Sequence, residues 1–315
     1  MKKIFFLLIF GSGLFVNAVA QDSTAQQTEN AAPVVKKAKF VKRTFQSSSI
    51  INLPSVEMVA KGNLQFMISH HFGNIWNESE DFGQNMAQVF GFNSGVAHTY
   101  LSFDYSVTDY ANVGVALTGN SKFEGWLKFK LLRQQTGLRN IPVTIVWLSV
   151  VNVDATKSTD TLNNLAWNKF SFMHQLMIAR KFSDKFSLQI SPTLIHYNLV
   201  PYGINNSNNI FSLGLGAKYQ LSDNKALTLE YARQFNMYED IFDKNGNIVN
   251  YVPNLLAVGF EFNTGGHVFQ FFLGNTTAAT NIEQLSRNTN SLNLFKHGQY
   301  ALGFRLNRAF FIGKN

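Results

Sequence analysis

The sequence contains no cysteine among its 315 residues, and this absence excludes whole classes of protein. No disulfide can crosslink the fold in an oxidising compartment. No metal or redox site that depends on a thiol can form either. The stability of the protein must therefore come from the fold itself.

Long apolar runs are also missing beyond the first 20 residues. No later segment approaches the roughly 18 uninterrupted apolar residues that a membrane-spanning helix needs. Hydrophobic residues still make up 45% of the chain, 30 residues are phenylalanine, and only 6 are proline. A β-barrel in a bilayer has this composition because only alternate residues of each strand meet lipid. A secreted β-sandwich has a similar composition, so the spacing of strands and connections must discriminate between the two.

The first 20 residues have the features of a secretory signal peptide. Lys2 and Lys3 precede an apolar run over residues 4–16, and a small-x-small cleavage pattern ends at Ala20. We therefore expect residues 1–20 to be removed and the protein to leave the cytoplasm.

Charge and polarity divide the rest of the chain into two parts. Residues 21–61 are interpreted as a partly disordered periplasmic segment that begins with a polar stretch without periodicity, and residues 62–315 as the barrel. Five basic residues fall between 36 and 43, where the plainest interpretation is a solvated linker and the alternative is contact with an anionic surface. The remainder is weakly basic, so no nucleic-acid partner is expected.

The clearest strands lie in residues 169–199. Two runs, 170–182 and 186–197, alternate apolar and polar residues, and a Ser-Asp-Lys turn separates them. Alternation of period two places successive side chains on opposite faces, so the pair is an antiparallel hairpin. Each strand is close to the roughly 9 to 11 residues that cross a bilayer on a tilt.

The same unit recurs along the chain and predicts about twelve strands. The other expected strands are 63–72, 98–107, 112–117, 123–131, 142–153, 211–220, 227–231, 256–262, 267–274 and 299–306. Residues 142–153 are apolar on both faces, which leaves their register the least defined. Short and long connections alternate, as in transmembrane barrels with short periplasmic turns and longer external loops. The pattern predicts an all-β, transmembrane antiparallel up-and-down barrel with both termini in the periplasm.

One face of the predicted sheet carries charged and small side chains. A barrel closed within lipid would turn this face inward, since its apolar face must meet the lipid. A barrel of about eight strands is packed solid and one of sixteen or more is open, so twelve allows a narrow channel or an inserted loop. The candidate lumen-lining residues are Glu124, Lys128, Lys130, Lys218, Glu230, Glu261 and Arg305.

Histidines offer little support for a metal site or an enzyme. His70 and His71 are adjacent on a strand and point to opposite faces, so they cannot chelate as a simple pair. A lipid hydrolase on the outer face is the main enzymatic alternative, and it needs a serine beside a base. No histidine on the apolar face has a serine two residues further along its strand. We expect no metal, no cofactor and no catalytic residues.

Several segments resemble an uncharacterised family of outer-membrane β-barrels found mainly in Bacteroidetes. The resemblance implies the fold and an outer-membrane location, and it supplies no activity or site residues. The segments are KGNLQF (61–66), ISHHFG (68–73), FDY (103–105), GWLKFKLLRQ (125–134), IARKFS (178–183), PTLIH (192–196), TGGHVFQ (264–270) and GFRLNR (303–308).

Two main hypotheses for function follow. The first is a narrow channel or transport barrel for small polar or anionic solutes, motivated by the inward lysines and Arg305. The second is a plugged structural or binding barrel whose loops 74–96 and 275–296 contact a partner. A lipid hydrolase and a soluble secreted sandwich are the minor alternatives. Outer-membrane lipid is the expected surrounding, and neither the solute nor a protein partner follows from the sequence.

Overall fold

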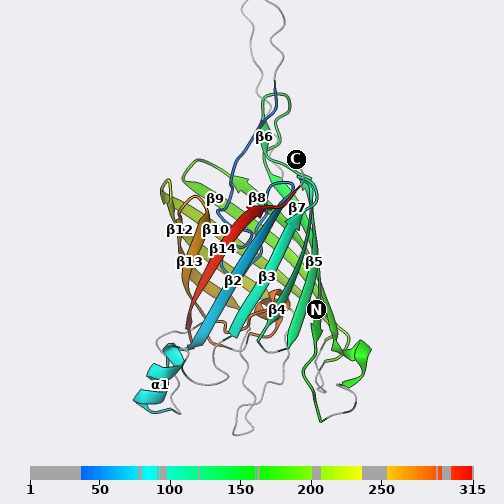
Figure 1. The fold of residues 1–315 in the computed structure, drawn as a ribbon, viewed down its shortest axis with the longest axis vertical. Coiled ribbons are helices and arrows are strands. Elements are labelled where there is room, and N and C mark those ends of the chain that lie inside the picture. The colour runs from blue at the N-terminus through cyan, green and yellow to red at the C-terminus, as the bar shows by residue number, and fades with distance from the viewer. Residues whose placement is uncertain are drawn as a thin grey trace, which may run out of the picture. The chain divides into compact units, whose positions relative to one another are not determined.

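Twelve antiparallel strands close into a barrel in the computed structural model of the protein (Figure 1). The structure describes residues 37–313 except 77–79, 91, 93–97, 120, 160, 162–163, 201–206, 236–253, 289 and 293–298. The expected signal peptide lies outside the described residues.

Each barrel strand pairs with the next one along the chain, and the last pairs with the first, which closes the sheet. The prediction of a twelve-stranded up-and-down barrel is confirmed. The strands are β2 (Asn63–Asn74), β3 (His98–Ser106), β4 (Ala111–Thr118), β5 (Lys122–Leu132), β7 (Thr144–Asp154), β8 (Phe170–Lys181), β9 (Phe186–Tyr197), β10 (Asn209–Ser222), β11 (Lys225–Gln234), β12 (Leu255–Asn263), β13 (His267–Gly274) and β14 (Ala301–Phe311). Two further strands, β1 (Lys39–Phe40) and β6 (Gln135–Thr136), form a separate small sheet.

Side chains alternate between the two faces of the wall as the period-two pattern predicts. On β2, Gln65, Met67, Ser69 and His71 are buried inside the barrel, while Phe66, Ile68 and His70, which alternate with them, point outward. The outer face carries large exposed apolar side chains on many strands, as a lipid-facing surface requires. Examples are Phe103, Val115, Phe129, Leu194, Leu215, Leu229, Phe271 and Leu302.

The connections differ between the two ends of the barrel. The turns after β3, β8, β10 and β12 are short and lie at the upper end in Figure 1. Long connections follow β2, β7, β9, β11 and β13, and they include the helix α1 (Phe82–Val89), the 3-10 turn η2 (Ala166–Lys169) and the helix α2 (Asn281–Ser286). The sequence pattern predicted polar loops at α1 and α2 and did not reveal the helices.

In the described part of the chain, no helix is both long and apolar enough to span a membrane.

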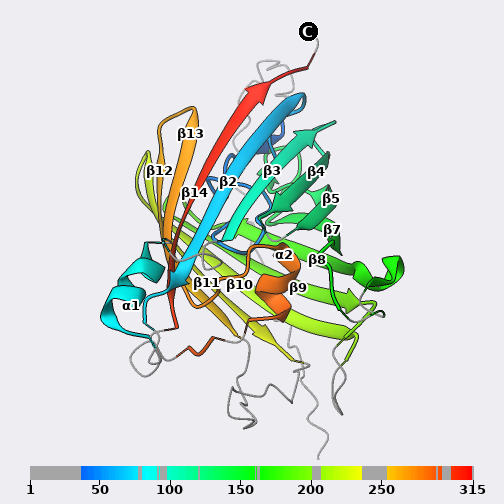
Figure 2. The ribbon, with the colours of Figure 1, turned by 60° about the horizontal axis from the view of Figure 1, so that its bottom comes forward.

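The hydrophobic core lies inside the barrel and not between layers. Residues 44–57, which precede β2, fold into the interior, and Figure 2 shows this blue segment within the wall. Helix α2 occupies the other mouth, with Ile282 and Leu285 buried in the same core. The inner face of β7 packs in this core through Val146, Leu148 and Val150. This packing explains why that strand is apolar on both faces.

Candidate functional site in the barrel interior

Residues 44–57, here called the plug hairpin, make a tight turn inside the barrel. The backbone N–H of Ile50 donates to the carbonyl of Leu53 at 2.8 Å, and that of Ser55 donates to Ser48 at 2.9 Å. The carboxylate of Glu57 closes the base of the hairpin by accepting the N–H of Thr44 at 2.7 Å. Among the described residues, the plug hairpin shares no strand ladder with the wall, since its one isolated bridge joins Ser49 to Pro54.

Glu230 on β11 holds the tip of the plug hairpin. Its carboxylate accepts the backbone N–H of Ile51 at 3.1 Å, of Asn52 at 2.8 and 3.0 Å, and of Leu53 at 3.0 Å. Three convergent N–H groups form an anion-binding nest, and hydrogen bonds to a charged acceptor are stronger than neutral ones. Glu230 is fully buried, so this nest supplies the hydrogen bonds that water would otherwise provide.

Other polar groups of the wall bind the carbonyl groups and side chains of the plug hairpin. The Arg305 guanidinium donates to the carbonyl of Ile51, next to the groups held by Glu230. Two glutamines also donate to backbone carbonyls, Gln270 Nε2 to Ile50 and Gln189 Nε2 to Pro54, each at 2.8 Å. Lys128 Nζ donates to the carbonyls of Ser48 and Ser55 at 3.3 and 3.5 Å. His71 Nε2 lies 2.8 Å from the side-chain oxygen Oδ1 of Asn52. The backbone of the plug hairpin is thus solvated by side chains of the wall.

Small residues of the wall leave room for the apolar side chains of the plug hairpin. A methyl group added at Gly216 would lie 2.1 Å from the Cδ1 atom of Ile50. At Gly214 it would lie 3.1 Å from Leu53, and at Gly259 it would lie 3.1 Å from Ile51. The sequence pattern marked these glycines as inward-facing, and the structure shows that the plug hairpin occupies the space they leave.

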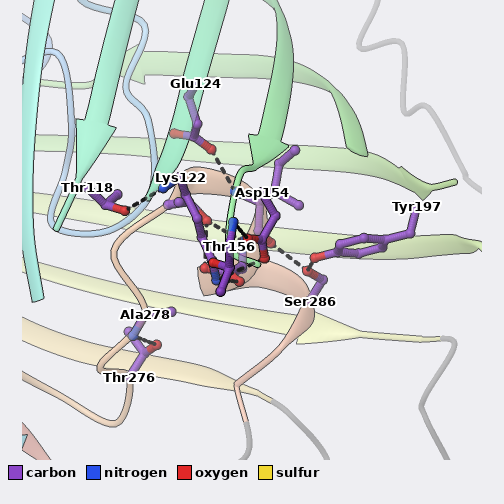
Figure 3. Close-up of polar contacts among 12 residues, drawn as sticks. Thr118, Lys122, Glu124, Asp154, Thr156, Tyr197, Thr276, Ala278 and Ser286 are labelled. Carbon is purple, nitrogen blue, oxygen red and sulfur yellow. Dashed lines mark hydrogen bonds and ion pairs between the residues drawn. The ribbon is translucent and has the colours of Figure 1, made fainter. Parts of the chain in front are cut away.

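Helix α2 is held at the opposite mouth by a second buried carboxylate. Glu124 on β5 accepts the backbone N–H of Asn281 at 3.2 Å, its side-chain amide at 2.8 Å, and the hydroxyl of Tyr100 at 3.0 Å. Lys122, also on β5, forms a salt bridge with Glu283 of α2 (Figure 3). The hydroxyls of Tyr197 and Ser286 lie 2.6 Å apart and join the helix to β9.

Little space remains between the plug hairpin and α2. A cavity of about 30 Å³ lies between them, lined by residues that include Pro54, Lys128 and Asn281. This volume holds about two water molecules, because one water needs roughly 10 to 15 Å³ by this measure. The space between these two described segments is therefore too small for a solute.

All seven candidate lumen residues lie on the inner face of the wall. Six are buried, and Lys130 is partly exposed. Four contact the plug hairpin or α2 directly: Glu124 binds α2, and Lys128, Glu230 and Arg305 bind the plug hairpin. Lys218 donates to the carbonyl of Arg43, one residue before the plug hairpin, at 3.5 Å. Glu261 accepts a hydrogen bond from Gln270 at 2.6 Å. Their expected role in lining a channel stays a prediction.

The N-terminal segment expected over residues 21–61 includes residues outside the described part and the plug hairpin at residues 44–57. Residues 21–36 lie outside the described part, whereas the plug hairpin is buried inside the barrel. The one sequence signal was the apolar cluster of Ile50, Ile51 and Leu53 within an otherwise serine-rich stretch. The sequence analysis did not predict that Gln189, Gln270 and His71 contact the plug hairpin, because alternation places a polar residue on the inner face without indicating which residue it contacts.

A serine and a histidine meet on the outer face of the barrel. No outward histidine has a serine two residues along its own strand, but the pairing of β7 with β8 places Ser149 opposite His174. Ser149 Oγ lies 3.0 Å from His174 Nδ1, and the indole of Trp147 donates to the same hydroxyl at 2.9 Å. Within the described ranges, His174 makes no salt bridge with a carboxylate that would orient it as a base.

The described residues contain no group of three or more His, Cys, Asp and Glu side chains that could hold a metal ion.

Among solved structures, the chain is similar to the NanC porin, with 7% identity, a TM-score of 0.44, and coverage of 79% of this chain and 98% of that one. It is also similar to OmpF of Salmonella typhi (6% identity, TM-score 0.38, 79% and 97% coverage) and to a FadL homologue of Pseudomonas aeruginosa (9%, 0.35, 86% and 94%). No curated protein matches the chain.

The family assignment rests on the sequence itself. Residues 45–310 match the family model described as a membrane bound beta barrel domain, DUF5777. The matched range begins within the plug hairpin and ends in the last strand, so it includes the inserted segments as well as the wall. The origin in Bacteroidetes that the resemblance implied stays a prediction. Because the match spans well over half of the chain, the protein belongs to this family of membrane-bound β-barrels.

Proposed function

We propose that the protein is an outer-membrane barrel that is closed at rest and becomes a channel for small polar or anionic solutes when the plug hairpin and helix α2 both leave the interior. The observation that carries this proposal is the plug hairpin itself. It fills the interior yet shares no ladder with the wall in the described part of the chain. Its withdrawal would therefore break side-chain contacts and leave every strand pair of the barrel wall intact.

The closed state is stable, so opening needs work from outside. Five apolar side chains of the plug hairpin expose no more than 1% of their surface: Phe45, Ile50, Ile51, Leu53 and Val56. Burial of such side chains contributes roughly 1.5 to 3 kcal/mol each, or about 10 kcal/mol together. Spontaneous withdrawal is then rare, and the opening event must be driven by a ligand or by force on the N-terminal side of the plug hairpin.

The inward-facing cations have two roles in this proposal, one in the closed state and one in the open state. Lys128, Lys218 and Arg305 bind carbonyl groups of the N-terminal segment in the closed state. Once the plug hairpin leaves, these cations face the empty interior beside the carboxylates of Glu230 and Glu261, so the emptied interior is polar and offers cationic groups to an anion. We place the protein in the outer membrane with both termini in the periplasm, exported through the signal peptide at residues 1–20.

Planar-bilayer conductance of the refolded mature chain tests the proposal. We expect the mature chain to insert without steady conductance. A chain that lacks residues 21–57, and in which residues 278–288 are also replaced by a Gly-Ser linker, should conduct steadily because both inserted segments are gone. Removal of residues 21–36 alone is the matched control and should stay silent. Steady conductance of the unaltered mature chain at the level of the double deletion would refute a closed resting state.

We also propose that the protein is not an enzyme. The best candidate for catalysis is the pair of Ser149 and His174 on the outer face, and it lacks an orienting carboxylate among the described residues. Two polar side chains that face lipid stabilise each other by a hydrogen bond, and this explains the pair without chemistry.

A further inference from the structure

Helix α1, in the connection between β2 and β3, buries polar side chains and exposes apolar ones. The helix packs against β2. Asn85 and Gln88 are buried, whereas Phe82 exposes 70% of its surface. The side-chain amide of Asn85 donates to the carbonyls of Glu80 and Asp81 at 3.2 and 3.1 Å, which satisfies this group in its buried position. A helix on the surface of a water-soluble protein has the opposite arrangement.

The exposed side of α1 forms an apolar face. Phe82, Met86 and Val89 are spaced at i, i+4 and i+7, which places them on one side of the helix. Phe90 follows at the C-cap with 61% of its surface exposed, and Phe92 exposes 82%. The ring centres of Phe90 and Phe92 lie 6.4 Å apart. Exposed apolar patches of this kind mark contacts with a membrane or a protein.

Helix α2 shows that another helix in a long connection of this protein has the usual orientation. Its apolar side chains Ile282 and Leu285 are buried in the core, and it lies within the mouth of the barrel (Figure 2). Helix α1 lies beyond the end of β2 and outside the ring of strands in both Figure 1 and Figure 2. Its apolar face therefore meets the surroundings of the barrel and not its interior.

The outer face of the wall indicates what these surroundings are. Phe72 of β2 and Phe304 of β14 both point outward, and their ring centres lie 6.1 Å apart. Strand β2 has 12 residues, and roughly 9 to 11 residues cross a bilayer on a tilt, so its end reaches the membrane–water interface. Trp76 follows shortly after β2 and is 43% exposed, and tryptophan is enriched at this interface. The apolar outer surface of the wall thus continues through Trp76 to α1.

We infer that α1, together with Phe90 and Phe92, lies in the interfacial layer of the membrane at this end of the barrel, and that lipid covers its apolar face. An interfacial helix lies in the plane of the membrane surface, with its apolar face at the boundary between headgroups and acyl chains. The helix itself carries no charged residue, so burial of apolar surface in lipid holds it there, and not attraction to charged headgroups. It anchors the connection between β2 and β3 beside the mouth, whether or not the interior opens.

Site-directed spin labelling tests the position of α1. The chain has no cysteine, so each single-cysteine variant carries one nitroxide label. Phe82→Cys and Phe90→Cys probe the apolar face, and Gln84→Cys, at an exposed position on the opposite side of the same helix, is the matched control. The refolded mature chain is placed in phosphatidylcholine vesicles, and collisions of each label with oxygen and with a water-soluble nickel chelate are measured. We expect the ratio of oxygen to nickel collisions to be about tenfold higher at residues 82 and 90 than at residue 84, because oxygen concentrates in the apolar layer and the chelate is excluded from it.

Two outcomes would overturn the inference. Ratios at residues 82 and 90 as low as the ratio at residue 84 would place the apolar face in water. Labels at 82 and 90 that are shielded from both reagents would place it against a protein, such as a second copy of this chain. Phe103→Cys on the outer face of β3 gives the reference for a lipid-facing label, and heat-dependent mobility on gels verifies that each variant is a folded barrel.

Discussion

Replacement of Glu230 by glutamine should loosen the tip of the plug hairpin without unfolding the barrel. The carboxylate accepts three backbone N–H groups, from Ile51, Asn52 and Leu53, at 2.8 to 3.1 Å. Glutamine has nearly the same shape, but its amide keeps one acceptor oxygen and turns an NH₂ group toward the remaining N–H donors. The buried N–H groups that face this amide lose their acceptor.

The magnitude follows from the number of hydrogen bonds that are lost. A hydrogen bond to a charged group contributes about 1.5 to 3 kcal/mol net, and a buried donor left unsatisfied costs about 1 to 3 kcal/mol. We therefore expect the seated tip to lose about 3 kcal/mol relative to the released tip. At 1.4 kcal/mol per factor of ten, the ratio of released to seated tip rises about a hundredfold. The apolar side chains still hold the plug hairpin, so steady conductance is not expected from this substitution alone.

Native-state hydrogen exchange followed by mass spectrometry measures this change directly. The peptide that contains Ile51 and Leu53 should exchange about a hundredfold faster in Glu230→Gln than in the unaltered chain. Glu124→Gln is the matched control, because Glu124 is also a buried inner-face carboxylate but binds α2 and Tyr100 at the opposite mouth instead of the plug hairpin. Equal exchange of this peptide in Glu230→Gln and the unaltered chain would show that the carboxylate does not hold the tip.

Three further substitutions probe the other contacts. Gly216→Leu should displace the plug hairpin and raise its susceptibility to protease, and adding Ile50→Ala should restore protection. Gly119→Ala is the control and should change nothing, because a methyl group there meets no atom within 4 Å. Loss of protection in this control would refute the inference that Gly216 makes room for Ile50. Ile282→Ala should destabilise the seated α2 by about 2 to 5 kcal/mol, measured as faster hydrogen exchange in α2, and unchanged exchange would mean that this fully buried side chain does not anchor the helix. The purified barrel should show no ester hydrolysis, and hydrolysis that disappears in Ser149→Ala would show an enzyme.

The strands of the wall were predictable because their constraint is local. Alternation on 170–182 and 186–197 matches the observed strands Phe170–Lys181 and Phe186–Tyr197 within a residue. A strand between lipid and the interior must alternate along its own sequence, whatever its neighbours are. The same reasoning placed Lys128 and Glu230 on the inner face, where the structure has them.

Contacts between distant segments were beyond such reasoning. The plug hairpin precedes the first strand by a few residues, yet it binds Glu230, which lies 177 to 179 positions away in sequence. Ser149 and His174 meet only because β7 and β8 pair in one register. Period-two alternation predicts which face of the sheet a residue lies on, but it does not predict which residue of another strand or segment contacts it.

By itself, the sequence determined an antiparallel barrel of about twelve strands, the faces of the side chains on the alternating strands, and the inward position of the charges, because each of these follows from alternation along one strand. Only the tertiary structure decided that the interior is filled. Whether a twelve-stranded barrel encloses a channel or a plug depends on how much of its interior volume the inward side chains and other segments of the chain fill. Ile50 fits against Gly216 only when segments far apart in sequence share that volume. The same packing turns Glu230 and Arg305 from candidate pore charges into the groups that hold the plug hairpin.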